Sequence, residues 1–149
     1  MSNLRLTLVG SGPQQDLILS LIEESKNQDI ITLLPWSDDV PTLLQEADIY
    51  ALSSDYEGWA RVLIEAMASG LPIVTTDVGC VGEVCKSGTH ALVTPTRDTN
   101  AFAEALITLA KDKEMRQRFS TTSIQTTKSF QDDMSEYATD WVNILDQTV

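Results

Sequence analysis

Residues 47–84 read ADIYALSSDYEGWARVLIEAMASGLPIVTTDVGCVGEV. This stretch begins with a short apolar run, continues through a turn with Glu57 and Gly58 into a helical pattern, and resumes as a second apolar run after Gly70 and Pro72. It therefore predicts a strand, a helix that stops at the glycine, and a second strand. A unit of this kind favours a parallel sheet with right-handed crossovers.

The same alternation extends along the rest of the chain. The expected strands are 4–9, 30–34, 49–52, 72–76 and 91–93. In the first half of the chain, helices are expected at Leu17, Ile18, Leu21 and Ile22, at Leu43 and Leu44 with Asp38 or Asp39 as N-cap, at Glu65, and, as a short helix, at Glu83. After Pro95, one helix is expected at Phe102, Ala105, Leu106 and Leu109 and another at Met115 and Phe119. A last helix is expected from about Asp132, with Met134, Tyr137, Trp141, Ile144 and Leu145 on its apolar face. This order predicts an α/β fold, a Rossmann-like doubly wound parallel sheet in one domain over residues 1–149, with extra C-terminal helices. Ligands of such sheets bind at the carboxyl ends of the strands.

Composition narrows the possible functions. The 149 residues suit one domain, and a net charge of −12 would repel a polyanionic backbone, so no nucleic-acid binding is expected. No apolar run is long enough to span a membrane, and the first residues lack a signal-peptide pattern, so a cytoplasmic location is expected. Cys80, Cys85 and His90 are too few for a zinc site; two reduced thiols and a loop histidine are expected, and no metal.

Two carboxylates eight positions apart are the main candidate site. Glu57 lies in the turn, and Glu65 stands within the apolar run 62–67, where burial of a carboxylate would require a satisfying partner such as a polar ligand. The amides at the start of the helix suit an anion. The alternative is structural: Glu57 caps the helix and Glu65 pairs with Arg61. The residues alone leave both interpretations open.

The turn at Gly10-Ser11-Gly12-Pro13 follows the first strand and resembles half of a phosphate-binding loop. The third glycine of a dinucleotide fingerprint is missing, and Asp16 would oppose a phosphate at this helix start. A plain tight turn explains the motif equally well, although the glycines could still help to wall a pocket.

Taken together, these motifs resemble the donor-binding half of retaining GT-B glycosyltransferases of the family 4 type. Glu57 and Glu65 fit the family's Glu-x7-Glu spacing. The family's Ala-Asp, Glu-Gly, Glu-Ala-Met-Ala-Ser-Gly and Thr-Asp-x-Gly motifs have counterparts in 47–84. The resemblance extends from Leu4 to about Trp141.

The resemblance implies a role for each matching residue. Glu57 would contact the donor sugar, as the catalytic candidate, and Glu65 would hold the ribose hydroxyls. Backbone amides of Gly58, Trp59, Ala60 and Arg61 would meet the sugar and diphosphate. The loop with Pro35 and Trp36 would lie against the nucleobase, although for Trp36 a packing role is an equal alternative. Gly10 and Gly12 would border the substrate. The family needs no metal or other cofactor.

Several features depart from the family pattern. Ala60 replaces a glycine, Ser53 a proline and Cys80 a glycine. The family's Arg and Lys that contact the diphosphate have no counterpart here, because the first strand–helix unit and the N-terminal acceptor domain are absent; Arg61 is the nearest substitute. We therefore expect a fragment or one part of a split enzyme that binds a nucleotide-sugar donor weakly and needs a partner chain. Self-association through Tyr137, Trp141 and Ile144 is a further expectation. The alternatives are a non-catalytic nucleotide-sugar-binding module and an interaction module.

Overall fold

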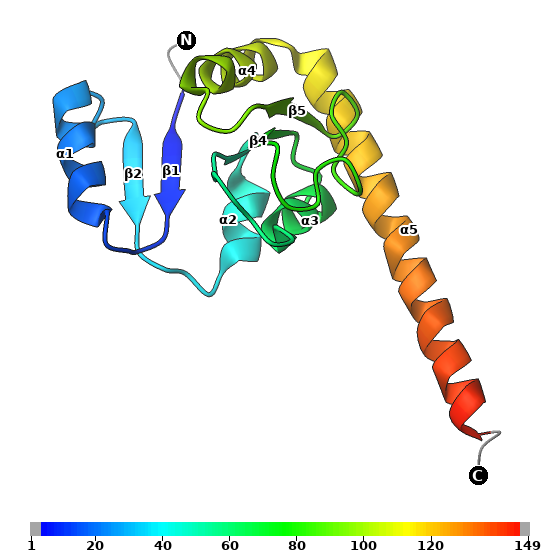
Figure 1. Ribbon diagram of the computed structural model, residues 1–149. Coiled ribbons are helices and arrows are strands. Elements are labelled where there is room, and N and C mark those ends of the chain that lie inside the picture. The colour runs from blue at the N-terminus through cyan, green and yellow to red at the C-terminus, as the bar shows by residue number, and fades with distance from the viewer. Residues whose placement is uncertain (1–3, 147–149) are drawn as a thin grey trace. The chain divides into compact units, whose positions relative to one another are not determined.

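A computed structural model describes the backbone of residues 4–146 and the side chains of residues 4–130 (Figure 1). Its elements are β1 (Leu6–Val9), α1 (Gln15–Ser25), β2 (Ile31–Leu34), α2 (Val40–Glu46), β3 (Tyr50–Leu52), α3 (Arg61–Ala68), β4 (Ile73–Thr76), β5 (Ala91–Thr94), α4 (Thr99–Lys111) and α5 (Lys113–Asp146). All paired strands run parallel, which confirms the predicted α/β class. The chain divides into two compact units, residues 1–40 and 41–149, and each is described here by itself. The single domain expected from the sequence stays a prediction.

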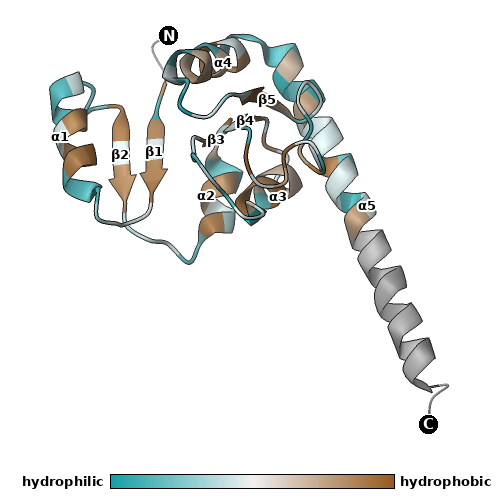
Figure 2. Cartoon of the chain, viewed as in Figure 1, coloured by the Kyte–Doolittle hydropathy of each residue, from teal (hydrophilic) through white to brown (hydrophobic). Residues whose placement is uncertain are grey.

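The first unit is one βαβ motif. β1 and β2 pair in parallel with Val9 opposite Leu34, and α1 connects them. Both strands are hydrophobic along their length (Figure 2). Ile18 and Ile22 of α1 are half-buried, whereas Leu17 stays 55% exposed. The apolar face predicted for this helix is therefore only partly covered.

The second unit is built on a three-stranded sheet in the order β3-β4-β5. All four residues of the central strand β4 are buried, as expected for a strand with neighbours on both edges and helices on its faces. Val74 of this strand forms a core cluster with Leu109 of α4 and Phe119 of α5. α4 and α3 lie on opposite sides of the sheet (Figure 1). This arrangement fixes the carboxyl ends of β3, β4 and β5 along one edge.

The C-terminal helices differ from the prediction at one boundary. α4 begins as expected after Pro95, with Asp98 as its N-cap: the carboxylate accepts a 2.9 Å hydrogen bond from the Ala101 amide. The two helices predicted around Phe119 and from Asp132 are instead one continuous helix, α5. The segment between them holds no glycine or proline, so nothing in the sequence breaks the helix. The side chains predicted to drive self-association, Tyr137, Trp141 and Ile144, lie outside the described ones.

The glycine-rich loop after β4 contains no helix, so the short helix predicted at Glu83 is wrong. Residues 80–85 instead form a tight turn, in which the amides of Val84 and Cys85 both donate to the Cys80 carbonyl at 3.0 and 3.2 Å. Gly79 and Gly82, both before Glu83, have positive φ angles of 61° and 86°. These angles do not fit a right-handed helix, so they interrupt helical geometry in this loop. Both cysteines are free and buried, as the sequence predicted, and burial raises the pKa of Cys85 to about 12.

His90 is in a loop, as predicted, but it is buried rather than exposed, with 3% of its surface accessible. Its Nδ1 accepts a 3.0 Å hydrogen bond from the Lys86 amide, so the neutral ring carries its proton on Nε2. That nitrogen lies 3.1 Å from Thr126 Oγ1 of α5, and Thr122 Oγ1 donates to the Thr89 carbonyl at 2.6 Å. The loop is thereby pinned to α5.

Candidate functional site

Glu57 lies between β3 and α3, at the carboxyl edge of the three-stranded sheet. Ser54 Oγ donates a 2.7 Å hydrogen bond to its Oε1. The backbone carbonyl of Ser54 in turn accepts a 2.6 Å hydrogen bond from Thr76 Oγ1, the last residue of β4. The half-buried carboxylate of Glu57 is therefore oriented by a chain of contacts that starts on the buried central strand.

The helix that follows presents unpaired amides. α3 begins at Arg61 after an N-cap residue, Ala60, that adopts the left-handed conformation (φ 54°, ψ 55°) and makes no side-chain cap bond. Among the described residues, the amides from Gly58 to Val62 donate to no protein acceptor, as is usual for the first turn of a helix. Glu57 does not cap this helix, so the structural alternative for this residue is wrong.

The turn is held in place by the loop after β4. The Cys80 amide donates to the Trp59 carbonyl at 3.1 Å. Gly79 approaches so closely that a Cβ added there would lie 2.5 Å from Ala60 Cβ. The conformation of the Glu57 turn thus depends on a glycine in a different segment.

Glu65 is exposed, so the prediction that its carboxylate is buried among apolar neighbours is wrong. The buried face of α3 is made by Leu63, Ala66 and Met67 at helical spacing, and the side chain of Glu65 falls outside that face. Among the described side chains the only ion pair is Arg97–Asp55, so the pairing of Glu65 with Arg61 does not form either. Among side chains 4–130, none forms an ion pair or a hydrogen bond with the Glu65 carboxylate.

Tyr50 of β3 carries a phenol that is shielded from solvent. Burial raises the pKa of this phenol to about 12, and the nearby carboxylates of Glu57 and Glu65 add to the rise. Both glutamates are therefore within electrostatic reach of one hydroxyl group, which stays protonated at neutral pH. That Glu57 and Glu65 share one binding site stays a prediction.

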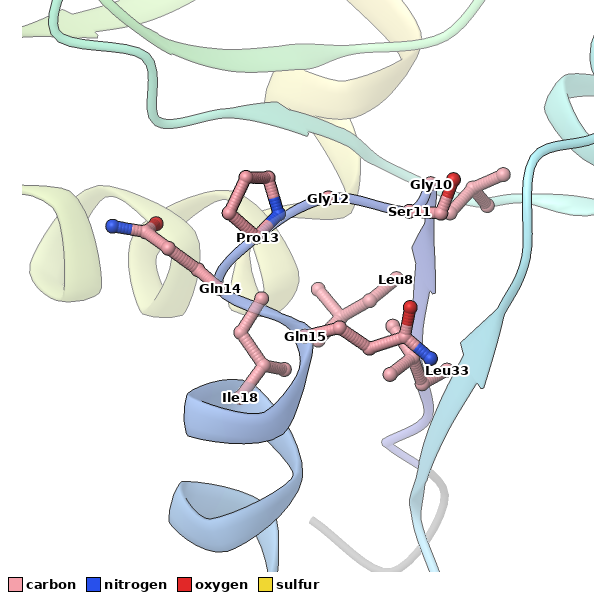
Figure 3. A pocket seen from close by; sticks show the side chains of 10 residues that line it. Leu8, Gly10, Ser11, Gly12, Pro13, Gln14, Gln15, Ile18 and Leu33 are labelled. Carbon is pink, nitrogen blue, oxygen red and sulfur yellow. The ribbon is translucent and has the colours of Figure 1, made fainter.

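The first unit holds a cavity of about 560 Å³ at the carboxyl end of β1. Gly10, Ser11, Gly12 and Pro13 line it together with Gln15 (Figure 3). The Gly10 amide donates to the Leu34 carbonyl at 3.0 Å, and the φ of Gly10 is 140°, a backbone angle that favours glycine. The expectation that these glycines wall a pocket is confirmed; their contact with a substrate stays a prediction.

Pro35 and Trp36 follow β2 and therefore lie at the same edge as the Gly10 turn. Trp36 is 74% exposed, and its Nε1 donates to Asp38 Oδ1 at 3.1 Å within its own loop. The ring is thus largely uncovered within the first unit, and base contact and packing both stay predictions for it. Because the two units are described separately, the joining of this loop with Glu57 in one site stays a prediction.

Sequence reasoning missed three residues of the second unit. Ser54 donates a hydrogen bond to Glu57, Tyr50 is a buried phenol whose pKa Glu57 helps to raise, and Arg97 pairs with Asp55 of the same turn. Ser54 stands three residues before Glu57, a spacing that could have suggested a contact. Arg97 is 42 positions away from Asp55 and carries no local signal.

The described residues hold neither a metal-binding cluster nor a membrane-spanning helix. No group of three or more His, Cys, Asp or Glu side chains among them could hold a metal ion. None of the described helices is long and apolar enough to cross a membrane.

The parallel sheets, the strand-end carboxylates and the unpaired amides define a Rossmann-like α/β fold of the kind found in GT-B glycosyltransferases. The chain belongs to the glycosyl transferases group 1 family, which it matches over residues 1–126. It is 37% identical, over 74% of its length, to N-acetyl-alpha-D-glucosaminyl L-malate synthase of Bacillus anthracis. It is also 30% identical, over 76% of its length, to glycogen synthase of Mycobacterium tuberculosis.

Solved structures show the same fold. The chain superposes on sucrose-phosphate synthase of Thermosynechococcus elongatus with a TM-score of 0.81 and 23% identity, covering 97% of this chain and 39% of that one. Anabaena Alr3699/HepE, solved in complex with UDP-glucose, gives a TM-score of 0.74 and 23% identity, covering 84% and 36% of the two chains. The chain spans 29% of the length of the Bacillus anthracis relative and 28% of that of the glycogen synthase.

Proposed function

We propose that this chain is the donor-binding part of a retaining nucleotide-sugar glycosyltransferase, which transfers a sugar to an acceptor held by an acceptor-binding domain or a partner chain. The observation that carries the proposal is the half-buried Glu57, oriented by Ser54 directly before the unpaired amides at the start of α3. The coverage of less than two fifths of the relatives named above supports a donor half rather than a whole enzyme.

In this proposal each group has a chemical task. Glu57, preset by Ser54, accepts hydrogen bonds from the donor-sugar hydroxyls, and Glu65 accepts them from the ribose. The amides from Gly58 to Arg61 meet the diphosphate, whose negative charge grows as the sugar leaves. Preorganised amides stabilise that charge without rearrangement, so the chemistry needs no metal.

Titration calorimetry tests the proposal on the full chain with UDP, GDP and ADP and with their sugars. We expect one nucleotide series to bind weakly, and Glu65→Ala to weaken it by at least about tenfold, because a charged acceptor of the ribose hydroxyls is lost. Glu104→Ala, which removes an exposed carboxylate on α4, is the matched control and should bind like the native chain.

The outcomes separate the candidate functions. Absence of binding with every nucleotide would refute the proposal and favour an interaction module. Unchanged affinity in the presence of EDTA is expected, and loss of affinity that Mg²⁺ restores would contradict the metal-independent chemistry. Full sugar transfer by the purified chain alone would contradict the need for an acceptor-binding partner.

A further inference from the structure

Arg97 lies in the loop after β5 and reaches the turn that follows β3. Its Nε donates a 3.0 Å hydrogen bond to Asp55 Oδ2, two residues before Glu57. Because β3 and β5 flank β4 in one parallel sheet, both loops leave the same edge. The ion pair therefore places a guanidinium beside the Glu57 turn, and it is the only ion pair among side chains 4–130.

Stability does not explain an arginine at this position. Arg97 has a φ of 62°, in the left-handed region that is unfavourable for residues with a Cβ. The two side chains of the pair are 81% and 53% exposed, and ion pairs at such exposure contribute little to folding. A strained residue without a structural benefit points to a role in binding.

The guanidinium keeps free donors that suit a phosphate. Only Nε of Arg97 is engaged; its two Nη groups have no protein partner in the described part of the chain. The planar fork of arginine binds phosphate oxygens in pairs. Asp55 and Glu57, together with Asp77 after β4, make this edge acidic, so a diphosphate needs a cation there.

We propose that Arg97 binds the diphosphate of the nucleotide-sugar donor, with Asp55 holding its guanidinium in position. The inference rests on the proposed function. Arg97, from the loop after β5, adds a cation to this edge of the sheet, where the sequence suggested only Arg61. Asp55 is the positioning residue: it fixes Nε and leaves the Nη groups for the ligand.

The test compares diphosphates with nucleosides. Calorimetry of the full chain with UDP, GDP and ADP, and with uridine, guanosine and adenosine, identifies the base that binds. Arg97→Gln should weaken the diphosphate about tenfold or more and leave the nucleoside unchanged, because a charge-assisted fork is lost. The salt dependence of diphosphate binding should also fall, and Arg97→Lys should lie between the two.

Two further variants complete the design. Asp55→Ala removes the acceptor that fixes Nε of Arg97, so it should weaken the diphosphate in the native background but not in the Arg97→Gln background. Arg118→Gln removes an exposed arginine of α5 and serves as the matched loss of charge. It should bind like the native chain, and thermal melts should show all variants folded.

The results distinguish the two proposals. If Glu65→Ala weakens nucleotide binding and Arg97→Gln does not, the assignment of Arg97 is overturned while the proposed function stands. If Arg97→Gln weakens diphosphate and nucleoside equally, Arg97 has only a structural role and the assignment is likewise overturned. If no nucleotide binds the native chain, the proposed function fails and this inference fails with it.

Discussion

Gly79→Ala tests whether the loop after β4 shapes the Glu57 turn. A Cβ at this position would lie 2.5 Å from Ala60 Cβ and 2.9 Å from the Trp59 carbonyl carbon, so backbone must move. The φ of +61° adds a left-handed penalty of about 1–2 kcal/mol, and overpacking adds about 1–3 kcal/mol. We expect a total loss of about 2–5 kcal/mol in the free energy of unfolding.

The matched control is Gly82→Ala in the same loop. Gly82 has a φ of +86°, but a Cβ there would meet nothing within 4 Å, so only the left-handed penalty of about 1–2 kcal/mol applies. Urea unfolding followed by circular dichroism gives both values. The difference between the two variants isolates the close approach of Gly79 to Ala60. Equal destabilisation of the two variants would refute the packing argument. If Gly79→Ala loses much stability but binds nucleotide with native affinity, the idea that this loop shapes the Glu57 turn is also refuted.

Three further results are expected. Phe119→Ala should lower the free energy of unfolding in urea by about 3–5 kcal/mol, because Phe119 is only 1% exposed. Leu17→Ala should lower it by less than about 1 kcal/mol, because Leu17 is 55% exposed. Similar losses in the two variants would contradict the difference in burial. Burial, aided by the charge of Lys86, lowers the pKa of His90 in the folded state, so below about pH 6.5 the unfolded state binds more protons than the folded state. The free energy of unfolding should therefore fall as the pH drops from about 6.5 through the lowered pKa. His90→Gln should lack this fall when unfolding is measured between about pH 7.5 and 5. Ser54→Ala should weaken donor binding severalfold in calorimetry with little change in melting temperature, since it frees the Glu57 carboxylate, and Ser54→Thr should restore the affinity.

The strands and most helices were predictable because their signals are local. Apolar runs bounded by glycine and proline located all five strands to within two residues, and Gly70 with its φ of 73° ends α3 as expected. The helix break predicted between Phe119 and Asp132 is wrong, because α5 is continuous there. The apolar positions around Phe119 and those from Asp132 were assigned to separate helices, but the segment between them holds no glycine or proline, so the helix continues.

The site was only partly predictable because burial and long-range contacts are tertiary properties. Apolar neighbours along the sequence suggested a buried Glu65, yet on a helix the neighbours of a residue in space are three and four positions away. The pairing of Glu57 and Glu65 came from their spacing, but the hydrogen bond that orients Glu57 comes from Ser54. The contacts of Thr76 with Ser54 and of Arg97 with Asp55 span 22 and 42 positions, and no local pattern encodes them.

Ala60 shows how far the resemblance to the family extends. The family has a glycine at this position, and the sequence alone could only suggest that a methyl group is tolerated. The structure gives the reason a glycine suits it: the residue has a φ of 54°, in the region that glycine adopts most easily. Alanine keeps that backbone conformation here because Gly79 leaves room for its methyl group and the Cys80 amide holds the Trp59 carbonyl before it. The backbone shape of this turn is therefore supported from a second loop, and an alanine fits at position 60 as long as that support remains.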